Sequence, residues 1–285
     1  VKASGLAAGK GAVVCDTPEE ALEAAERMMV RREFGDAGST ILIEEKLTGQ
    51  EVSVLAIVAG RSIWLMDPCQ DHKQVGEGDS GRNTGGMGAY CPTPLLDAAT
   101  LDGIQREILV PTADALRREG IEYRGVLYAG LMLTPGGPKV LEFNCRLGDP
   151  ETQATFLRLD DNFAEIARDA SEGALETKSL NWRKEAVACV VLAAEGYPGS
   201  ARKGDEITGI DEAMALSGVT VYHAGTRLEE DRLTTSGGRV LSVCGRGPTL
   251  SDALEAAYGG VSKISFDGMW YRSDIGRDTL TKLGT

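Results

Sequence analysis

Two predicted strands joined by a short turn constrain this chain most. Residues 126–133 form an apolar run, a Pro- and Gly-rich turn follows, and residues 139–144 read as a returning strand. Because side chains alternate along a strand, Glu142 and Asn144 project from one face, and Arg146 joins them if the chain stays extended. Two oxygen donors and a guanidinium on one face suit a magnesium ion held against phosphate. A strand end that is merely polar is the alternative interpretation of these three residues alone.

Composition limits the classes of protein to which the chain can belong. Its 285 residues suffice for about two domains. A hydrophobic content of 42% with 26% charged residues is ordinary for a globular protein. The formal net charge of −13 argues against a nucleic-acid-binding surface, which would be basic. An anionic nucleotide is still compatible, because a few local cations and a metal ion can outweigh the overall charge.

The cysteines and the lack of long apolar runs bear on the compartment. Six cysteines lie far apart without a C-x-x-C pair, and the two histidines are too few to suggest zinc. This spacing is typical of reduced cytoplasmic thiols rather than of a disulfide framework. No apolar run approaches the roughly 18 residues of a membrane span, and we expect no signal peptide. The chain starts on Val1 without a methionine, so we expect its N-terminal part to be missing.

Strand and helix patterns alternate along the chain, which predicts an α/β (α+β) protein. Helices are predicted after the N-caps Thr17 and Asn162, over 101–118 with a kink or break at Pro111, and over 250–264. Further strands are predicted at 40–44, 51–59, 62–66, 186–194, 219–226 and 239–245. A long glycine-rich loop is expected over 71–90, and a polar linker over 179–184.

The first glycine-rich stretch, residues 2–11, is not a P-loop. Three residues instead of four separate its first glycine from Gly9-Lys10, and Gly11 follows where Ser or Thr is required. A strand, a glycine turn and a second strand could still bring backbone N–H groups to phosphate oxygens. Lys2 and Lys10 would then supply the charge. A plain hairpin turn is the alternative.

Two other segments are candidates for binding. A structureless stretch as long as residues 71–90 is usually functional or mobile. Its tetrapeptide 83–86, Asn-Thr-Gly-Gly, offers several donors to an anionic group. In the segment 43–51, Glu51 opens a strand and could meet ribose hydroxyls. The alternatives are a disordered surface loop for the first segment and a solvated strand-end charge for Glu51.

In this order, these pieces resemble the ATP-grasp superfamily and, within it, the glycinamide ribonucleotide synthetases (phosphoribosylamine–glycine ligases). The matching stretches span almost the whole chain and are 1–14, 43–51, 70–92, 128–153, 221–226, 236–240 and 271–276. The Asp71-His72-Lys73 tripeptide, the segment 83–90 and the block 147–151 are specific to this family rather than to ATP-grasp proteins at large.

The resemblance implies an ATP-grasp fold in three parts. We expect a partial lid subdomain over 1–47, the core over 48–180 and a small C-terminal α+β module over 181–285. It also implies a preceding α/β domain and further lid sequence upstream of Val1. In the C-terminal module, His223 is expected to be a packed structural residue.

The implied reaction joins glycine to 5-phosphoribosylamine and converts ATP to ADP and phosphate through a glycyl phosphate. The cofactors would be ATP and Mg²⁺, with Mn²⁺ as a substitute. No side-chain nucleophile is needed, which agrees with the lack of a Ser/His/Asp or Cys/His constellation. The alternatives are an ATP-grasp ligase with another acceptor and a non-catalytic nucleotide-binding module.

The resemblance also implies roles for individual residues. The metal ligands would be Glu142 and Asn144, and the catalytic residues Arg146, Lys73 and Asp149, the last orienting Arg146 or the substrate amine. The residues implied for the nucleotide are Lys2, Gly5, Gly9, Lys10 and Gly11 over the phosphates, Glu44, Glu45 and Leu47 at the adenine edge, and Glu51 at the ribose. Those implied for the substrates are Asn83, Thr84, Gly85, Gly86, Met87 and Gly88. Many ATP-grasp enzymes also carry an acidic residue on the first strand of the metal hairpin, and residues 128–133 have none.

Overall fold

A computed structural model of the protein describes residues 1–7, 11–175 and 179–283. The helices are α1 (Pro18–Met29), η1 (Gly35–Gly38), α2 (Ala98–Ile104), η2 (Gln105–Leu109), α3 (Val110–Arg118), α4 (Glu151–Arg158), α5 (Phe163–Glu172), α6 (Ile210–Met214), α7 (Leu250–Val261) and α8 (Arg277–Leu283). The strands up to residue 91 are β1 (Lys2–Ala3), β2 (Ile41–Leu42), β3 (Gln50–Ala59), β4 (Ser62–Leu65), β5 (Gln70–Asp71), β6 (Gln74–Gly76), β7 (Ser80–Asn83) and β8 (Gly88–Cys91). The later strands are β9 (Arg124–Thr134), β10 (Gly137–Asn144), β11 (Ala186–Ala193), β12 (Val219–His223), β13 (Thr226–Glu229), β14 (Arg232–Thr235) and β15 (Arg239–Gly247).

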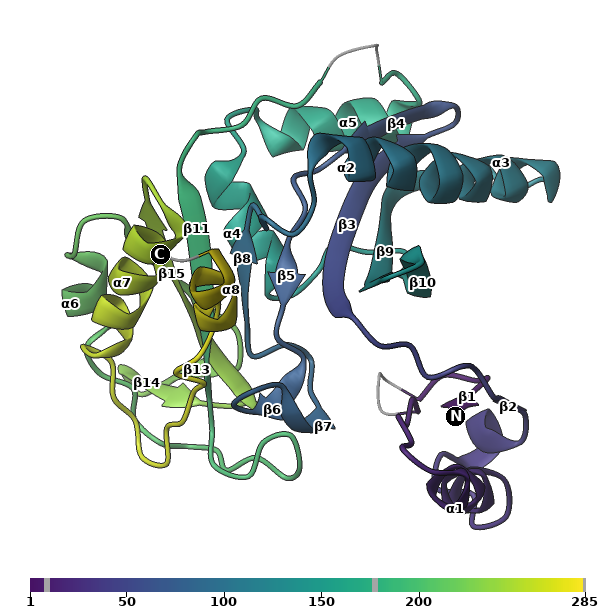
Figure 1. Cartoon of the computed structure of the whole chain (residues 1–285). Coiled ribbons are helices and arrows are strands. Elements are labelled where there is room, and N and C mark those ends of the chain that lie inside the picture. Colours follow the sequence, from purple (N-terminus) through teal and green to yellow (C-terminus); the bar gives the residue numbers. More distant parts are fainter. Residues whose placement is uncertain (8–10, 176–178, 284–285) are drawn as a thin grey trace.

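Two antiparallel sheets form the body of the molecule (Figure 1). One has the strand order β10-β9-β3-β4, and the other β12-β15-β11-β8-β5. The second sheet contains strands from both sides of the predicted boundary at 180, because β8 pairs with β11 from Gly88 opposite Val190 to Cys91 opposite Val187. The core and the C-terminal module are therefore joined through a shared sheet. The domain boundaries themselves remain a prediction.

Strand β3 is buried on both faces. Val54 and Val58 pack in a core with α2, η2 and α3. Leu55 and Ile57 point the other way, into a core that includes residues of α5. Since the side-chain period is two, one strand serves both layers. The sheet that carries the predicted metal hairpin is thus fixed by packing on each side.

The helix predicted over 101–118 continues through Pro111 instead of breaking. Segments α2, η2 and α3 follow each other directly, and η2 is a π-helical turn that ends two residues before the proline. Proline has no N–H to donate and its ring crowds the preceding turn. A wider turn gives that ring room, so the helical path is preserved.

Other local predictions have mixed outcomes. The N-caps are confirmed, since the side chains of Thr17 and Asn162 accept hydrogen bonds from backbone N–H groups of α1 and α5. The expectation for His223 is wrong: this side chain is exposed, 3.1 Å from the Thr226 hydroxyl. A strand end projecting to solvent leaves the ring nothing to pack against.

The expectation of a structureless loop over 71–90 is also wrong. Strands β6 and β7 form a hairpin, and its turn is tied to the C-terminal part of the chain. Buried Arg272 donates to Asp79 (2.8 Å) and to the Gln74 carbonyl (3.1 Å). His72 accepts from the Gly276 N–H through Nε2, so its Nδ1 carries the proton toward Asp79. These contacts join residues about 200 positions apart, so no local sequence pattern could have predicted the hairpin's order.

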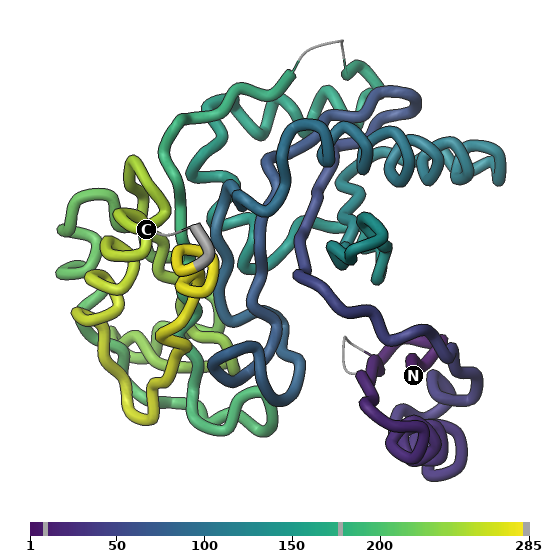
Figure 2. The backbone as a smooth tube through the Cα atoms, viewed as in Figure 1, coloured from purple at the N-terminus to yellow at the C-terminus, as the bar shows by residue number. Residues whose placement is uncertain are grey.

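Helix α1 and strands β1 and β2 form a small unit, connected to the sheets by the chain that enters β3 (Figures 1 and 2). Within the described ranges, no helix combines the length and apolar character needed to cross a bilayer.

Candidate functional site

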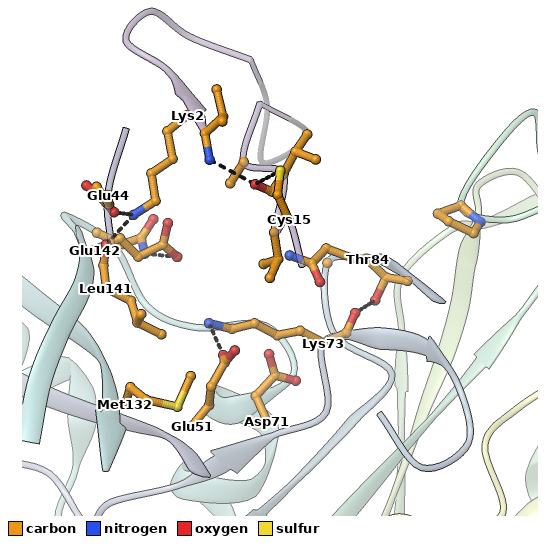
Figure 3. A pocket seen from close by; sticks show the side chains of 18 of the residues that line it. Lys2, Cys15, Glu44, Glu51, Asp71, Lys73, Thr84, Met132, Leu141 and Glu142 are labelled. Atoms are coloured by element: carbon orange, nitrogen blue, oxygen red, sulfur yellow. Dashed lines mark hydrogen bonds and ion pairs between the residues drawn. The ribbon is translucent and has the colours of Figure 1, made fainter. Parts of the chain in front are cut away.

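A cavity of about 1050 Å³ opens between the described residues up to Leu47, which we call the roof, and residues of β3, β9 and β10, which we call the floor. The strand β5, the β7–β8 connection and the C-terminal module supply its side walls. Most of the predicted site residues line it: Lys2, Glu44, Glu45, Leu47, Glu51, Lys73, Asn83, Thr84, Gly85, Glu142, Asn144, Arg146 and Asp149. Residues distant in sequence therefore meet in one place (Figure 3).

The sheet register places the predicted metal ligands on the floor. A bulge at Leu141 shifts the pairing, so that Glu142 lies opposite Gly130 and Asn144 opposite Tyr128. The two side chains share one face, and Asn144 Nδ2 lies 3.3 Å from Glu142 Oε1. Without this bulge, a one-residue shift would turn them to the other face. The predicted common face is confirmed.

Lys73 crosses the floor toward Glu51 (Figure 3), with its Nζ 3.1 Å from Glu51 Oε2. Burial alone would lower the pKa of this amine. The nearby carboxylates of Glu51 and Asp71 outweigh burial and raise the pKa of Lys73, so the side chain stays cationic. Glu51, predicted at the ribose, is thus already engaged by Lys73 in this structure.

Lys2 reaches from the roof to the floor. Its Nζ donates to the Leu141 carbonyl at 2.8 Å and lies 2.7 Å from Glu44 Oε2. The bulge at Leu141 is what leaves this carbonyl available to a side chain. Arg146 lines the cavity and donates to the Leu147 carbonyl at 2.9 Å. Two predicted phosphate-binding cations therefore face the same space as Glu142.

Arg239 of β15 holds the predicted substrate loop. It lies in the matching stretch 236–240, but the resemblance implied no role for it. Its Nη1 donates to the carbonyls of Gly85 (2.7 Å), Gly86 (3.3 Å) and Asp149 (2.7 Å). Its Nη2 donates to Asp149 Oδ2 at 2.8 Å. The Tyr197 hydroxyl accepts from the Gly85 N–H at 3.0 Å. Asp149 therefore pairs with Arg239 here rather than with Arg146.

Buried acidic groups lie beneath the floor and were also missed. Glu151 is 2% exposed and accepts hydrogen bonds from the hydroxyls of Tyr128 and Ser53. Burial, with the negative charge of Glu151, raises the pKa of Tyr128, so the phenol stays a donor. Asp71 lines the cavity beside Lys73, and its Oδ1 is shielded without a hydrogen-bond partner among the described residues. In the sequence, Glu151 follows Asp149-Pro150. That position indicates the first turn of a helix and does not reveal a buried hydrogen-bond network.

Some predicted binding residues do not line the cavity. Met87 and Gly88 are buried in β8 or next to it, and a side chain on Gly88 would collide with the Cys189 carbonyl. A side chain on Gly5 would strike Ala37, and one on Gly11 would strike Ala7. These glycines, with buried Gly86, permit close packing of the backbone. Gly9 and Lys10 lie outside the described residues.

The donor set on the floor fits a magnesium ion. No cluster of three or more His, Cys, Asp and Glu side chains suited to a metal occurs in the described ranges. The carboxylate of Glu142 and the amide side chain of Asn144 are neighbours that line a cavity wide enough for a nucleotide. One carboxylate and one amide are sufficient for Mg²⁺, since it keeps waters and phosphate oxygens as its other ligands. They would not suffice for a structural zinc site.

Two family models match the sequence. Residues 1–152 match the phosphoribosylglycinamide synthetase ATP-grasp (A) domain, and residues 187–278 match the phosphoribosylglycinamide synthetase C domain. The chain is 51% identical over 281 residues to the phosphoribosylamine–glycine ligase of Rhodopirellula baltica, which covers 98% of this chain and 64% of that protein. The chain thus spans about two thirds of the length of this curated relative.

Solved structures agree. The crystal structure of phosphoribosylamine–glycine ligase from Thermotoga maritima matches with a TM-score of 0.84 and 36% identity, over 96% of this chain and 68% of that one. The biotin carboxylase domain of the Hydrogenobacter thermophilus 2-oxoglutarate carboxylase, solved with MgADP, matches with a TM-score of 0.69 over 94% of this chain and 57% of that one. At 15% identity this second likeness bears on the fold alone.

Proposed function

Because the chain belongs to the phosphoribosylglycinamide synthetase family and has the ATP-grasp fold expected from its sequence, we propose that the protein joins glycine to 5-phosphoribosylamine at the expense of ATP. The products are glycinamide ribonucleotide, ADP and phosphate, and a glycyl phosphate is the intermediate. The observation that carries the proposal is the cavity itself. It is lined by the proposed magnesium ligands, by the predicted cations Lys2, Lys73 and Arg146, and by residues 83–85 of the family-specific loop.

Glu142 and Asn144 would hold the Mg²⁺ or Mn²⁺ ion. When bound, the ion supplies charge neutralisation and a fixed arrangement for the phosphate oxygens. The adjacent amide and carboxylate are hard oxygen donors at the rim of the floor, where a triphosphate can approach from the cavity.

The roof and the first residues of β3 would hold the nucleotide. Lys2 is proposed to exchange its contact with Glu44 for a phosphate oxygen, since its ammonium already lies over the floor. The main chain at 44–47 would meet the adenine edge, and Glu51 the ribose. In that arrangement Glu51 shares its carboxylate between the ribose and Lys73.

The chain's own cations would carry the chemistry of phosphoryl and acyl transfer. Arg146 and Lys73 stabilise the charge that develops on the phosphoryl oxygens, which requires positioned donors and no nucleophile from the protein. Residues 83–85 border the glycine and amine positions, held there by Arg239 and Tyr197. Asp149 is proposed to orient the substrate amine, with its carboxylate fixed by Arg239.

We further propose that full activity needs sequence that the relatives carry outside the matched region, since this chain spans 64% of the Rhodopirellula protein. That sequence would complete the phosphoribosylamine site and the lid. A reducing compartment such as the cytoplasm suits the six cysteines, all of which are free thiols.

The experiment is ATP-dependent phosphate release by the complete protein, with glycine and freshly generated phosphoribosylamine, each omitted in turn. Release that requires both substrates is the expected result. Tight MgATP binding without release under any combination would instead indicate another acceptor or a non-catalytic module.

A further inference from the structure

Asp71 is a carboxyl group without a partner at the centre of the cavity wall. Three other acidic side chains that line the cavity are engaged: Glu51 with Lys73, Glu142 with Asn144, and Glu44 with Lys2. Asp149 is held by Arg239 and by Gln153. No hydrogen bond or ion pair in the described ranges involves the side chain of Asp71, and its Oδ1 is shielded from solvent.

The surroundings of Asp71 suit a group that gains and loses a proton. Burial, together with the negative charges of Glu151 and Glu51, raises the pKa of Asp71 well above its ordinary value. The cations Lys73 and Arg239 act in the opposite direction. Asp71 is therefore a stronger base than a solvent-exposed aspartate, and general bases work best when their pKa lies near the working pH.

The position of Asp71 relative to the substrate loop is fixed by close packing. Its strand β5 pairs with β8, with Asp71 opposite Ala89. Gly86, between Asp71 and Pro150, has φ +111°, and a Cβ there would lie 2.7 Å from Asp71 Oδ1. Only glycine fits at this position, because any Cβ would press against the carboxyl group of Asp71 and the ring of Pro150. The side chain of Lys73 lies between Asp71 and Glu142 (Figure 3).

We propose that Asp71 accepts the proton from the amine that attacks the acyl phosphate. This inference rests on the proposed function and assigns a catalytic residue for its second step. The amine nitrogen forms a bond to the carbonyl carbon, and the carbon–oxygen bond to the phosphoryl group breaks with its electron pair on the phosphate oxygen. The N–H proton passes to Asp71 and then to the departing phosphate, so Asp71 ends as the carboxylate and inorganic phosphate leaves protonated.

Amide formation and acyl phosphate formation can be measured separately in the complete protein. The first is followed as glycinamide ribonucleotide, and the second as glycine-dependent scrambling of ¹⁸O from the β,γ-bridge of labelled ATP, which needs no amine acceptor. Asp71→Asn keeps the shape and removes the base. We expect amide formation to fall by about 10²–10⁴-fold, with scrambling within about threefold of the unsubstituted protein.

Asp231→Asn is the matched control, because Asp231 is exposed in the β13–β14 turn, far from the cavity lining. It should leave both rates unchanged. Undiminished amide formation in Asp71→Asn would overturn the proposal. So would an equal loss of both rates in a variant whose thermal unfolding matches the control, because Asp71 would then act before the amine does.

A second variant, Asp71→Ala, keeps the proposal testable if Asp71→Asn does not fold. In Asp71→Ala, added formate should restore part of the amide-forming rate, since a small carboxylate can occupy the vacated space and take the proton. No response to formate, with acyl phosphate still formed, would overturn the proposal. If the unsubstituted protein itself shows no glycine-dependent scrambling, the proposed function fails, and this inference fails with it.

Discussion

The roof and the floor of the cavity are positioned by different kinds of contact. The floor strand β3 is paired with β9 along its whole length, from Gln50 opposite Leu133 to Ala59 opposite Arg124. Helices pack against both of its faces. In the roof, β1 and β2 pair over two residues each, and Leu6, Leu22 and Ile43 are 93%, 71% and 74% exposed.

The roof and the floor therefore differ in how firmly they position their side chains for a reaction. Floor side chains such as Glu142 have their direction set by the sheet register, so they are preorganised before any substrate binds. Roof side chains depend on a few exposed contacts, such as that from Lys2 to the Leu141 carbonyl. Segments with few buried contacts open at a lower free-energy cost than sheet strands. We therefore expect floor substitutions to change the rate of chemistry and roof substitutions to change binding.

The largest expected effect is that of Glu142→Gln on the floor. Replacing the carboxylate weakens the metal–phosphate arrangement without disturbing the sheet, because Glu142 is exposed on an edge strand. The turnover rate should fall by at least about 10²–10³-fold, with an unchanged unfolding temperature. The measurement is the initial rate across a Mg²⁺ titration. Glu255→Gln on α7 is the control, and kinetics equal to that control would remove Glu142 from the metal site.

Arg239→Ala tests whether the C-terminal module contributes to the site. The substitution removes hydrogen bonds to Asp149 and to the carbonyls of the substrate loop. Because the guanidinium of Arg239 is partly buried, the loss of its charge-assisted hydrogen bonds should lower the free energy of unfolding by about 2 kcal/mol. The kcat should fall about 10-fold or more because the loop loses its fixed position. Denaturant unfolding and steady-state kinetics measure both.

Arg227→Ala is the matched control in the same module. Arg227 is exposed beside Glu229, so its loss should change stability by no more than about 0.5 kcal/mol. Arg239→Lys should recover only part of the activity, since an ammonium cannot reproduce a planar fork of donors. Full activity of Arg239→Ala would separate the C-terminal module from the substrate site.

The contrast between roof and floor also explains what the sequence could predict. The shared face of Glu142 and Asn144 follows from a period of two, and the caps at Thr17 and Asn162 follow from local hydrogen bonding. The bulge at Leu141 does not, because it depends on how β10 pairs with β9. Rules based on local sequence can therefore predict the faces and the ends of a single helix or strand, but not how two strands pair.

Arg239 and Asp71 show where sequence reasoning stops. Arg239 lies 90 residues from Asp149, and only the sheet that joins β8, β11 and β15 brings them together. A lone arginine in a strand has no pattern that names its partner. For Asp71, the informative feature is the lack of a partner, which can be read only after every neighbour is in place.

On the roof, Lys2→Ala should have a moderate effect on nucleotide binding and almost none on stability. The proposed phosphate contact is one charge-assisted hydrogen bond, so the KM for MgATP should rise about 10-fold, with a smaller change in kcat. The ion pair with Glu44 is partly exposed, with side-chain exposures of 29% and 49%, and stabilises little. Lys184→Ala, exposed and outside the cavity lining, controls for loss of charge. A loss confined to kcat would contradict the assigned difference between roof and floor.

The smallest effect concerns pH and the β6–β7 hairpin beside the floor. Hydrogen bonds from His72 and Arg272 hold the pKa of Asp79 at about 2, below its ordinary 3.8. Because the folded state has the lower pKa, the contribution of Asp79 to stability is complete above about pH 4 and is lost as the pH falls toward 2. Urea midpoints between pH 2 and 6 should therefore fall more steeply for the unsubstituted protein than for Asp79→Asn, with the two curves converging at the acid end. Parallel curves would mean that the charge of Asp79 does not contribute to stability. The contacts of Arg272 and His72 with the hairpin would then position it through packing and uncharged hydrogen bonds.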